Sequence, residues 1–283
     1  MSRQLSEDRD AAAIRVATWN VWWRFGRWKA RAKAITTILR SVDADVCTLQ
    51  EVWAGDGDNL AGQLAAVLDY QWTWAASPRS DRWCRRLGLD DALLGNAILS
   101  RWPLSDSYNE LLPDDDDNPE GRLVLGADVR TPWGSLPVLT TQLNSHPAGS
   151  AIRQLQVDQL ALAVSRLTGR TFPPVVTGDF NAQPSSDEVR RFEGHLTPPA
   201  VPGQVLIDAW RYTDAVEAGF TWDRANPLVA ATFEPSARID YIFVGRPTRG
   251  GRGHIRAAAL FATEPLGGVW ASDHFGVLAD LAV

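Results

Sequence analysis

Hydrophobic residues along the chain follow two spacings. Where they alternate with polar residues or form short apolar runs, the pattern predicts strands, because successive side chains of a strand face opposite sides. These segments are residues 14–19, 45–49, 71–75, 95–100, 123–129, 136–141, 175–181, 239–244 and 277–283. Where they recur every three or four positions, the pattern predicts helices, at residues 29–41, 59–68 and 150–167. Ser185 and Glu188 form a capping-box pattern that predicts a further short helix, and residues 206–218 are expected to contain another.

The remaining segments are expected to be loops. Residues 1–13 are predicted to be a mobile tail, residues 76–94 to be irregular, and residues 105–121 to form an exposed acidic loop. No linker separates two cores, so residues 14–283 are expected to form one domain. Several strand pairs are joined too tightly for crossover helices, which favours an α/β fold with mixed sheets rich in antiparallel pairs.

Composition narrows the class of protein. The chain has 283 residues, of which 45% are hydrophobic and 22% charged, as is ordinary for a soluble globular protein. A net charge of −6 disfavours a protein that binds nucleic acid mainly through a basic face. It is weaker evidence against an enzyme acting on phosphates, because bound divalent cations would offset acidic side chains in the site. The two cysteines lack zinc-site spacing, and no segment resembles a signal peptide or a membrane span, so we expect a cytoplasmic monomer.

Two local enrichments each allow two interpretations. The chain has 13 tryptophans, and several crowd into residues 19–28, where they either pack in the core or form the aromatic rim of a substrate cleft. Four arginines surround Trp83, and they are either ordinary surface charge or a site for a short single strand or a phosphate-rich head group. These arginines are Arg79, Arg82, Arg85 and Arg86.

Polar side chains follow the expected strands at the points where those strands end. Six endings share this pattern: Trp19-Asn20, Gln50-Glu51, Gly95-Asn96, Gly178-Asp179-Phe180-Asn181, Ile239-Asp240 and Asp273-His274. In the fourth, an extended chain would point Asp179 and Asn181 the same way, and Gly178 is expected to give a sharp turn. One such ending is usually a turn or a helix cap, but six rich in oxygen acceptors predict a single converging site.

The residue types indicate metal-assisted phosphate chemistry. Oxygen ligands suit a hard cation such as Mg²⁺, with Mn²⁺ as the alternative, rather than zinc. Glu51 is the best single ligand, with Asn20 beside it. His274 follows a carboxylate, and a second carboxylate such as Asp240 would fix its tautomer and make it a better proton acceptor. Together these groups predict a metal-dependent hydrolase of phosphate esters.

The ordered motifs resemble those of the endonuclease/exonuclease/phosphatase superfamily, which has the DNase I-like fold. The resemblance is carried by Trp19-Asn20, Gln50-Glu51, Gly178-Asp179-Phe180-Asn181, Ile239-Asp240-Tyr241 and Ser272-Asp273-His274, and it extends from about residue 14 to the C-terminus. It implies a four-layer α/β sandwich, in which two mixed, largely antiparallel sheets pack face to face with helices outside. The site would lie at one end of that sandwich.

The resemblance also implies roles for the site residues. Glu51 would be the main magnesium ligand, with Asn20 close to the metal and the phosphate and Asp273 assisting at the metal. Asp179 would position or activate the attacking water, and Asn181 would stabilise the charge that develops on phosphorus.

Further residues are implied at and around this centre. Asp240 and His274 would form a carboxylate–histidine pair. Asn96 matches a strand on which relatives carry a phosphate-contacting residue. Arg153 matches a recurrent helix opening, where a structural ion pair is an equal alternative to a substrate contact. Trp222 is expected to pack beside the site and to help set specificity.

One position departs from the family pattern. Relatives usually carry histidine where this chain has Gln142, in Thr140-Thr141-Gln142-Leu143. Glutamine donates hydrogen bonds but cannot exchange a proton near neutral pH. The chain is therefore either an active enzyme suited to good leaving groups or a pseudoenzyme that binds a phospho-ligand with reduced turnover. His146 is either a substitute for the missing histidine or an ordinary loop residue, and the substrate stays open among nucleic acids, nucleotides and phospholipid head groups.

Overall fold

A computed structural model describes residues 13–89, 92–213 and 217–283. The predicted tail, residues 1–13, lies outside these ranges except for Ala13, which begins the first strand. No helix within the described ranges is both long and apolar enough to span a membrane.

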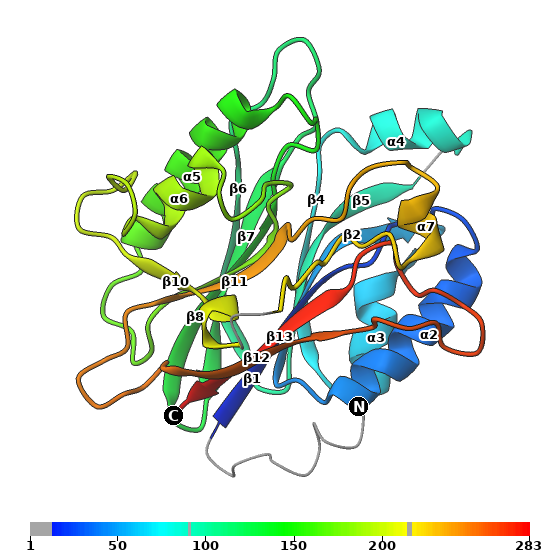
Figure 1. Cartoon of the computed structure of the whole chain (residues 1–283). Helices are drawn as coiled ribbons and strands as arrows, with labels where there is room; N and C mark the ends of the chain where they lie inside the picture. The colour runs from blue at the N-terminus through cyan, green and yellow to red at the C-terminus, as the bar shows by residue number, and fades with distance from the viewer. Residues whose placement is uncertain (1–12, 90–91, 214–216) are drawn as a thin grey trace.

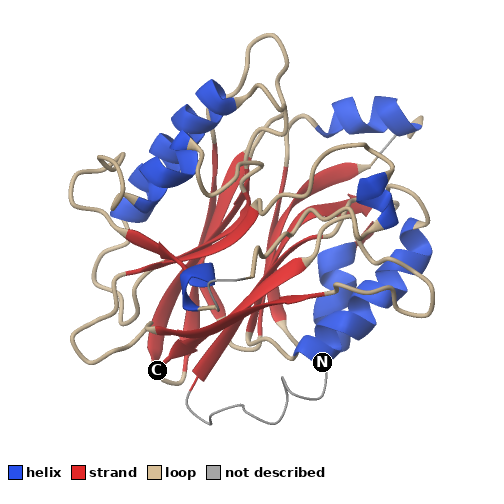
Figure 2. Ribbon diagram, viewed as in Figure 1, coloured by secondary structure: helices blue, strands red, loops and turns tan. Residues whose placement is uncertain are grey.

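The strands form two mixed sheets that face each other (Figures 1 and 2). The first sheet has the order β12 (Ile255–Phe261), β13 (Gly276–Ala282), β1 (Ala13–Asn20), β2 (Val46–Gly55), β5 (Leu93–Ser100) and β4 (Gln71–Ala76), and β3 (Asp58–Asn59) pairs with β2. The second has the order β10 (Leu206–Asp208), β11 (Asp240–Gly245), β9 (Val175–Asp179), β8 (Gly134–Gln142), β7 (Leu123–Thr131) and β6 (Leu104–Leu111). The pairs β1–β2 and β8–β9 are parallel, and the other pairs are antiparallel.

Helices cover the outer face of each sheet (Figure 1). Helices α2 (Trp28–Val42) and α3 (Leu60–Leu68) pack on the first sheet, and α5 (Ser150–Ser165) and α6 (Asp187–Glu193) pack on the second. Three groups of buried apolar residues fill the interfaces between the layers, one under each helical layer and one between the sheets. The expected four-layer α/β sandwich is therefore confirmed.

Two short helices lie outside these layers. Helices α4 (Ser80–Leu87) and α7 (Pro227–Ala230) sit near one end of the sandwich, at the upper right of Figure 1. The 3₁₀ helix η1 (Ala209–Tyr212) follows β10 directly.

Several local predictions were wrong, mostly where an element has an unusual composition. Residues 76–94 contain α4, and the segment expected to be an acidic loop contains β6, an edge strand that pairs on one side only and stays largely exposed. Residues 206–218 do contain a helix, the four-residue 3₁₀ helix η1, which the strand β10 precedes. The capping box does not form, because Ser186 is the N-cap of α6 and Glu188 binds Arg153 instead. The edge strand β12 was not predicted.

Alternation along the inner strands positions the site. Every second residue faces the opposite sheet, and in β1, β2, β8, β9 and β11 these residues are apolar at one end of the strand and polar at the other. In β1 the inward series is Ile14, Val16, Thr18 and Asn20. In β2, β8, β9 and β11 the polar inward residues lie at the same end of the sandwich as Asn20, so they gather there.

Candidate active site

Strand register brings the predicted residues of the second sheet side by side. Asp179 ends β9 and lies opposite Gln142 of the parallel strand β8 and opposite Asp240 of the antiparallel strand β11. Asn20 approaches from the facing sheet and donates to the Asp179 carboxylate. All four side chains are almost fully buried, so residues far apart in sequence form one enclosed polar centre.

Gly178 has a different task from the one expected. It lies inside β9 rather than at a turn, with φ of 141°, and a Cβ atom there would come within 1.9 Å of the Thr141 carbonyl oxygen. Glycine therefore permits the close approach of β9 to β8. The extended chain ends at Asp179, because Asn181 adopts a left-handed conformation with φ of 48°.

The turn after β9 fixes the Asp179 carboxylate. The backbone N–H of Asn181 donates to Asp179 Oδ1 at 3.0 Å, and the Asn181 side chain donates to the Leu143 carbonyl, also at 3.0 Å. The expected common direction of Asp179 and Asn181 is thus replaced by a side-chain-to-backbone turn.

Two amides bridge two carboxylates at the heart of the site. Asn20 Nδ2 lies 3.0 Å from Glu51 Oε1 and 3.1 Å from Asp179 Oδ2. Gln142 Nε2 lies 2.8 Å and 3.1 Å from the same two oxygens. The two amides therefore donate to the same two oxygens, and their N–H groups offset the repulsion between the carboxylates.

An ion-pair chain that the sequence did not suggest sets the direction of Gln142. Arg122 donates to Gln142 Oε1 and pairs with Glu120 at 2.8 Å, and Glu120 in turn accepts from the Ser145 backbone and hydroxyl at 2.9 and 2.7 Å. Burial opposes ionisation of Glu120, but Arg122 and Ser145 outweigh it and lower the pKa of that carboxyl group. The charged chain holds the Gln142 oxygen, so its N–H groups face Glu51 and Asp179.

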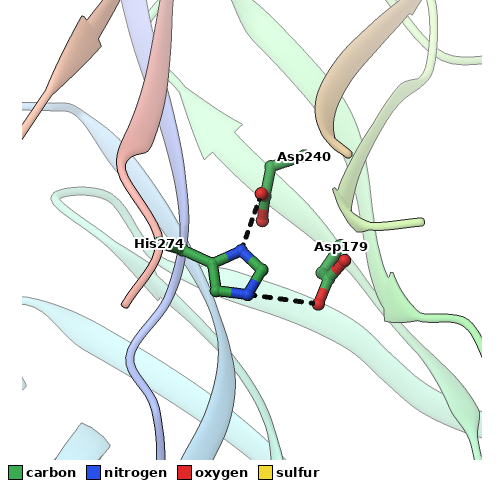
Figure 3. A group of neighbouring side chains, drawn as sticks. All are labelled: Asp179, Asp240 and His274. Carbon is green, nitrogen blue, oxygen red and sulfur yellow. Dashed lines mark hydrogen bonds and ion pairs between the residues drawn. The ribbon is translucent and has the colours of Figure 1, made fainter. Parts of the chain in front are cut away.

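The expected carboxylate–histidine pair is present (Figure 3). His274 Nδ1 lies 2.8 Å from Asp240 Oδ2, and His274 Nε2 faces Asp179 Oδ2 at 4.0 Å. Burial works against the imidazolium, but Asp240 and Asp179 raise the pKa of His274 well above its ordinary value. Burial and Asp240 also raise the pKa of Asp179, while His274 lowers it.

A bulge aims Glu51 into the site. The pairing of β2 with β5 shifts between Leu49 and Val52, and Glu51 adopts a left-handed conformation with φ of 55°. Gln50 already faces the opposite sheet, so regular alternation would send Glu51 toward the helices. The extra residue instead allows Glu51 to reach the amides of Asn20 and Gln142.

Asp273 completes the acidic side of the site. Its pKa rises to about 7, chiefly through burial and with a contribution from Glu51, although His274 and Arg31 oppose the rise. This crowding of negative charge fits a divalent cation, and the carboxylate oxygens suit Mg²⁺ or Mn²⁺. Asn20 directs its nitrogen toward the carboxylates and accepts the Trp22 backbone N–H at its oxygen, at 2.9 Å.

A second group of possible ligand atoms lies next to the first. Atoms of Asp179, Asp240 and His274 lie within 4.8 Å of one another, and all three residues are buried. Asp240 Oδ1 is buried without a hydrogen-bond partner among the described residues. Carboxylate oxygens that could bind a cation therefore lie on both sides of Asp179, from Glu51 on one side and from Asp240 on the other.

Arg31 is a site-supporting residue that the sequence analysis missed. It is 2% exposed, and its guanidinium donates to backbone carbonyls of the segment after β1, including Val21 and Trp23, and to Ala271, just before the Ser272-Asp273-His274 motif. Burial lowers the pKa of Arg31 to about 10, against the attraction of Asp273 and Glu51, so the side chain is charged at neutral pH. The sequence did hold a clue to its burial, because Arg31 lies four residues before Ile35 on the apolar stripe of a predicted helix.

Three further predicted residues lie around this centre. Asn96 donates to the Leu123 carbonyl at 3.3 Å, so its amide holds the start of β7. Arg153 pairs with Glu188 at 2.7 Å and donates to the Asn144 and His146 carbonyls, which supports the loop after Gln142.

Trp222 packs edge-on against His274, with ring centroids 5.0 Å apart. Its Nε1 atom is buried and has no hydrogen-bond partner within the described ranges. His146 uses Nδ1 to accept the Ala148 backbone N–H, as an ordinary loop histidine would.

Solved structures with the same fold cover nearly the whole chain. TDP2 of D. rerio, complexed with a single-strand DNA product, matches with a TM-score of 0.76 and 21% identity over 97% of this chain and 100% of that chain. The human nocturnin catalytic domain with bound sulfate matches with a TM-score of 0.70 and 20% identity over 95% of this chain and 94% of that one. An endonuclease/exonuclease/phosphatase from Beutenbergia cavernae DSM 12333 matches at 0.68 and 23%, over 96% and 72%.

At such identities these likenesses show the fold alone, and no curated protein matches the sequence. The model of the Endonuclease/Exonuclease/phosphatase family, in contrast, matches residues 17–274, which include every motif of the site. The chain therefore belongs to the endonuclease/exonuclease/phosphatase family.

Proposed function

We propose that the protein is a divalent-metal-dependent hydrolase of phosphate esters that acts by attack of water on phosphorus. The observation that carries this proposal is the buried Asp179 carboxylate, which Asn20 and Gln142 hold while it faces the Asp240–His274 pair. Glu51 and Asp273 would hold Mg²⁺ or Mn²⁺, with Asn20 beside them. When bound, the ion supplies positive charge that offsets the phosphate and the crowded carboxylates.

The side chains divide the proton transfers between them. Asp179 accepts a proton from the attacking water, since burial raises its pKa and makes it a better base. His274 is held through Nδ1 by Asp240, and its raised pKa keeps a proton on Nε2 for donation to an oxygen of the phosphoryl group. The pair therefore donates, where the sequence analysis expected an acceptor. The 4.0 Å between Asp179 and His274 is too long for a hydrogen bond and lets both groups address one reacting centre.

Gln142 takes the place of a proton-exchanging histidine in this proposal. Its amide donates to Glu51 and Asp179 and resembles Asn20 in that respect. It would contribute geometry and hydrogen bonds but no proton. This favours substrates with good leaving groups, and it motivates the alternative that the protein binds a phospho-ligand with reduced turnover.

The neighbours point to nucleic acid among the possible substrates. D. rerio TDP2 was crystallised with a single-strand DNA product, and the two chains share a fold over nearly their full lengths. We therefore place phosphodiesters of nucleic acids ahead of phospholipid head groups.

The test is a panel of bis-p-nitrophenyl phosphate, p-nitrophenyl phosphate, single-stranded DNA and RNA, each with Mg²⁺, Mn²⁺ or EDTA. We expect metal-dependent turnover that Asp179→Asn abolishes and Asp187→Asn leaves unchanged. Asp187 is a matched control, because its side chain is 75% exposed on α6. Absence of metal-dependent turnover on every substrate would overturn the hydrolase and favour the binding protein.

A further inference from the structure

Helix α4 and the segment after β1 share a surface that combines aromatic rings with arginines. We propose that this surface binds a single strand of nucleic acid leading out of the active site, an inference that rests on the hydrolase function proposed above. The surface, here named the aromatic–arginine strip, consists of Trp22, Phe25, Arg82, Trp83 and Arg86.

The aromatic rings of the strip form a row in which Phe25 contacts both Trp22 and Trp83. The ring centroids of Trp22 and Phe25 are 5.8 Å apart, and those of Phe25 and Trp83 are 5.9 Å apart. All three rings are half-buried, so part of each ring is accessible. Phe25 and Trp83 pack against the core under α2, and Trp22 lies against the Arg31 guanidinium, 4.7 Å from its ring centroid. Rings held in this way offer flat faces at little entropic cost, as stacking on nucleobases requires.

Arginines lie over the same rings. The guanidinium of Arg86 is 5.7 Å from the Phe25 centroid and 5.8 Å from that of Trp83, and Arg82 is 5.5 Å from the latter. Arg86 is exposed, and no carboxylate among the described residues lies within ion-pair distance of it. The exposed guanidinium of Arg86 therefore adds local positive charge to the strip, although the chain as a whole carries a net charge of −6.

The strip connects to the active site at both of its ends. At one end, the Trp22 backbone N–H donates to Asn20 Oδ1 at 2.9 Å. At the other, Arg82 lies 3.7 Å from Glu120, whose partner Arg122 holds Gln142. A strand cleaved beside Asn20 and Gln142 would therefore meet Trp22 on one side and Arg82 of α4 on the other.

This combination fits a single-stranded polynucleotide better than other partners. Each nucleotide presents one flat base and one negative phosphate, and the strip offers both aromatic rings and guanidinium groups. A duplex would keep its bases stacked on each other and unavailable to the rings. A membrane surface would engage the arginines but would not depend on the presence of bases, and this difference can be measured.

The binding experiment uses the Asp179→Asn protein in EDTA, so that no turnover interferes. Anisotropy of a labelled single-stranded oligonucleotide of about ten nucleotides should show about tenfold weaker binding for Trp83→Ala and for Arg86→Ala. The salt dependence of binding should fall by about 0.7 in log–log slope for Arg86→Ala. An abasic oligonucleotide should lose its sensitivity to Trp83→Ala. The controls are Trp72→Ala and Arg249→Ala. Trp72 is exposed on β4, outside the strip, and Arg249 lies on an exposed loop.

Contrary outcomes separate this inference from the proposed function. If wild type hydrolyses small esters while Trp83→Ala and Arg86→Ala bind the oligonucleotide like the controls, the strip is wrong and the hydrolase stands. If no ester is hydrolysed but the strip variants lose oligonucleotide binding, the hydrolase is wrong and the strip stands. Strip-dependent binding to vesicles of phosphatidylcholine and phosphatidylserine, without oligonucleotide binding, would identify a membrane surface instead. Since Arg86 is exposed, Arg86→Ala keeps the test valid if Trp83→Ala fails to fold.

Discussion

The space between the two sheets has an apolar end and a polar end, and the same strands supply both. In β8 the inward side chains run from Leu136 and Val138 through Thr140 to Gln142. In β11 they run from Val244 and Ile242 to Asp240. The pairing of β8 and β11 shows no register shift, so along these two strands the difference between the ends lies in side-chain chemistry.

A buried belt of hydroxyl groups separates the two ends. Thr177 donates to Thr48 at 2.7 Å, and Gln50 donates to Thr18 and Thr140 at 3.1 and 2.8 Å. These contacts satisfy the hydroxyl groups and the Gln50 amide nitrogen where the apolar core stops, while Gln50 Oε1 has no hydrogen-bond partner among the described residues.

The apolar end and the polar end of this space have opposite effects on stability. The apolar end stabilises the fold by burial, while the polar end gathers carboxylates whose pKa values are raised chiefly by burial and further by neighbouring carboxylates, so that their ionised forms are unfavourable there. A change at one end should therefore alter stability, and a change at the other should alter activity.

The largest expected effect comes from the polar end. Asp179→Asn should lower kcat by about 1,000-fold, because it removes the proposed base while keeping the shape of the side chain. Its free energy of unfolding in EDTA should change by less than about 1 kcal/mol, because neutralising a buried charge offsets the loss of one accepted hydrogen bond. Steady-state kinetics and urea denaturation measure the two quantities, and a marked loss of stability would contradict the comparison.

The matched change at the apolar end should behave in the opposite way. Leu136→Ala, on the same face of β8 as Gln142, should lower the free energy of unfolding by about 3 kcal/mol because it leaves a cavity. The kcat of the folded fraction should remain within about twofold of wild type. Leu155→Ala is the control, because Leu155 is 55% exposed on α5 and should change stability by less than about 0.5 kcal/mol. A large loss of kcat in Leu136→Ala would show that the two ends are coupled.

The pH dependence of stability should reflect the polar end. Burial and Glu51 raise the pKa of Asp273 to about 7, so between about pH 4 and that value the folded state holds a proton that the unfolded chain has released. His274, with its raised pKa, likewise keeps its proton to a higher pH in the folded state. Both effects stabilise the fold at low pH and are lost as pH rises. In EDTA, we expect a decrease of about 2 kcal/mol in the free energy of unfolding between about pH 5 and about pH 8.

Urea denaturation across this pH range checks the expectation. Asp273→Asn should flatten the curve, Asp187→Asn should not, and Mg²⁺ should stabilise wild type more at the higher pH, where the carboxylates are ionised. Stability that rises with pH in EDTA would refute the proposed charge density at this end.

The smallest expected effect concerns Gln142. Gln142→His should raise kcat about threefold to tenfold on an unactivated diester such as an oligonucleotide, because histidine can exchange a proton. It should leave turnover of a p-nitrophenyl ester nearly unchanged, since that leaving group needs no proton. Gln142→Asn, which keeps an amide but shortens it, is the matched control. Equal rates for Gln142→His and wild type on both substrates would mean that the missing histidine does not limit the reaction.

Sequence pattern predicted most of the inner elements of the sandwich, because buried strands and amphipathic helices carry strong hydrophobic periodicity. Elements at the periphery were harder to predict. The edge strand β6 has a polar sequence, and it forms because β7 supplies its hydrogen bonds. Helix α4 has few apolar residues, and its Trp83 and Arg86 pack on Phe25, which is distant in sequence.

Local pattern was enough to predict the layered α/β class and the polar residues that gather at one end of the sandwich, since alternation and strand-end chemistry are local properties of the chain. How those residues face one another depends on the packing of the two sheets. Three features depend on contacts between distant segments. A bulge turns Glu51 inward, and the Arg122–Glu120 pair orients Gln142. Arg31 donates hydrogen bonds to two separate loops. Such contacts arise only when the sheets pack, because a buried charge or a left-handed residue is tolerated only where surrounding groups compensate it.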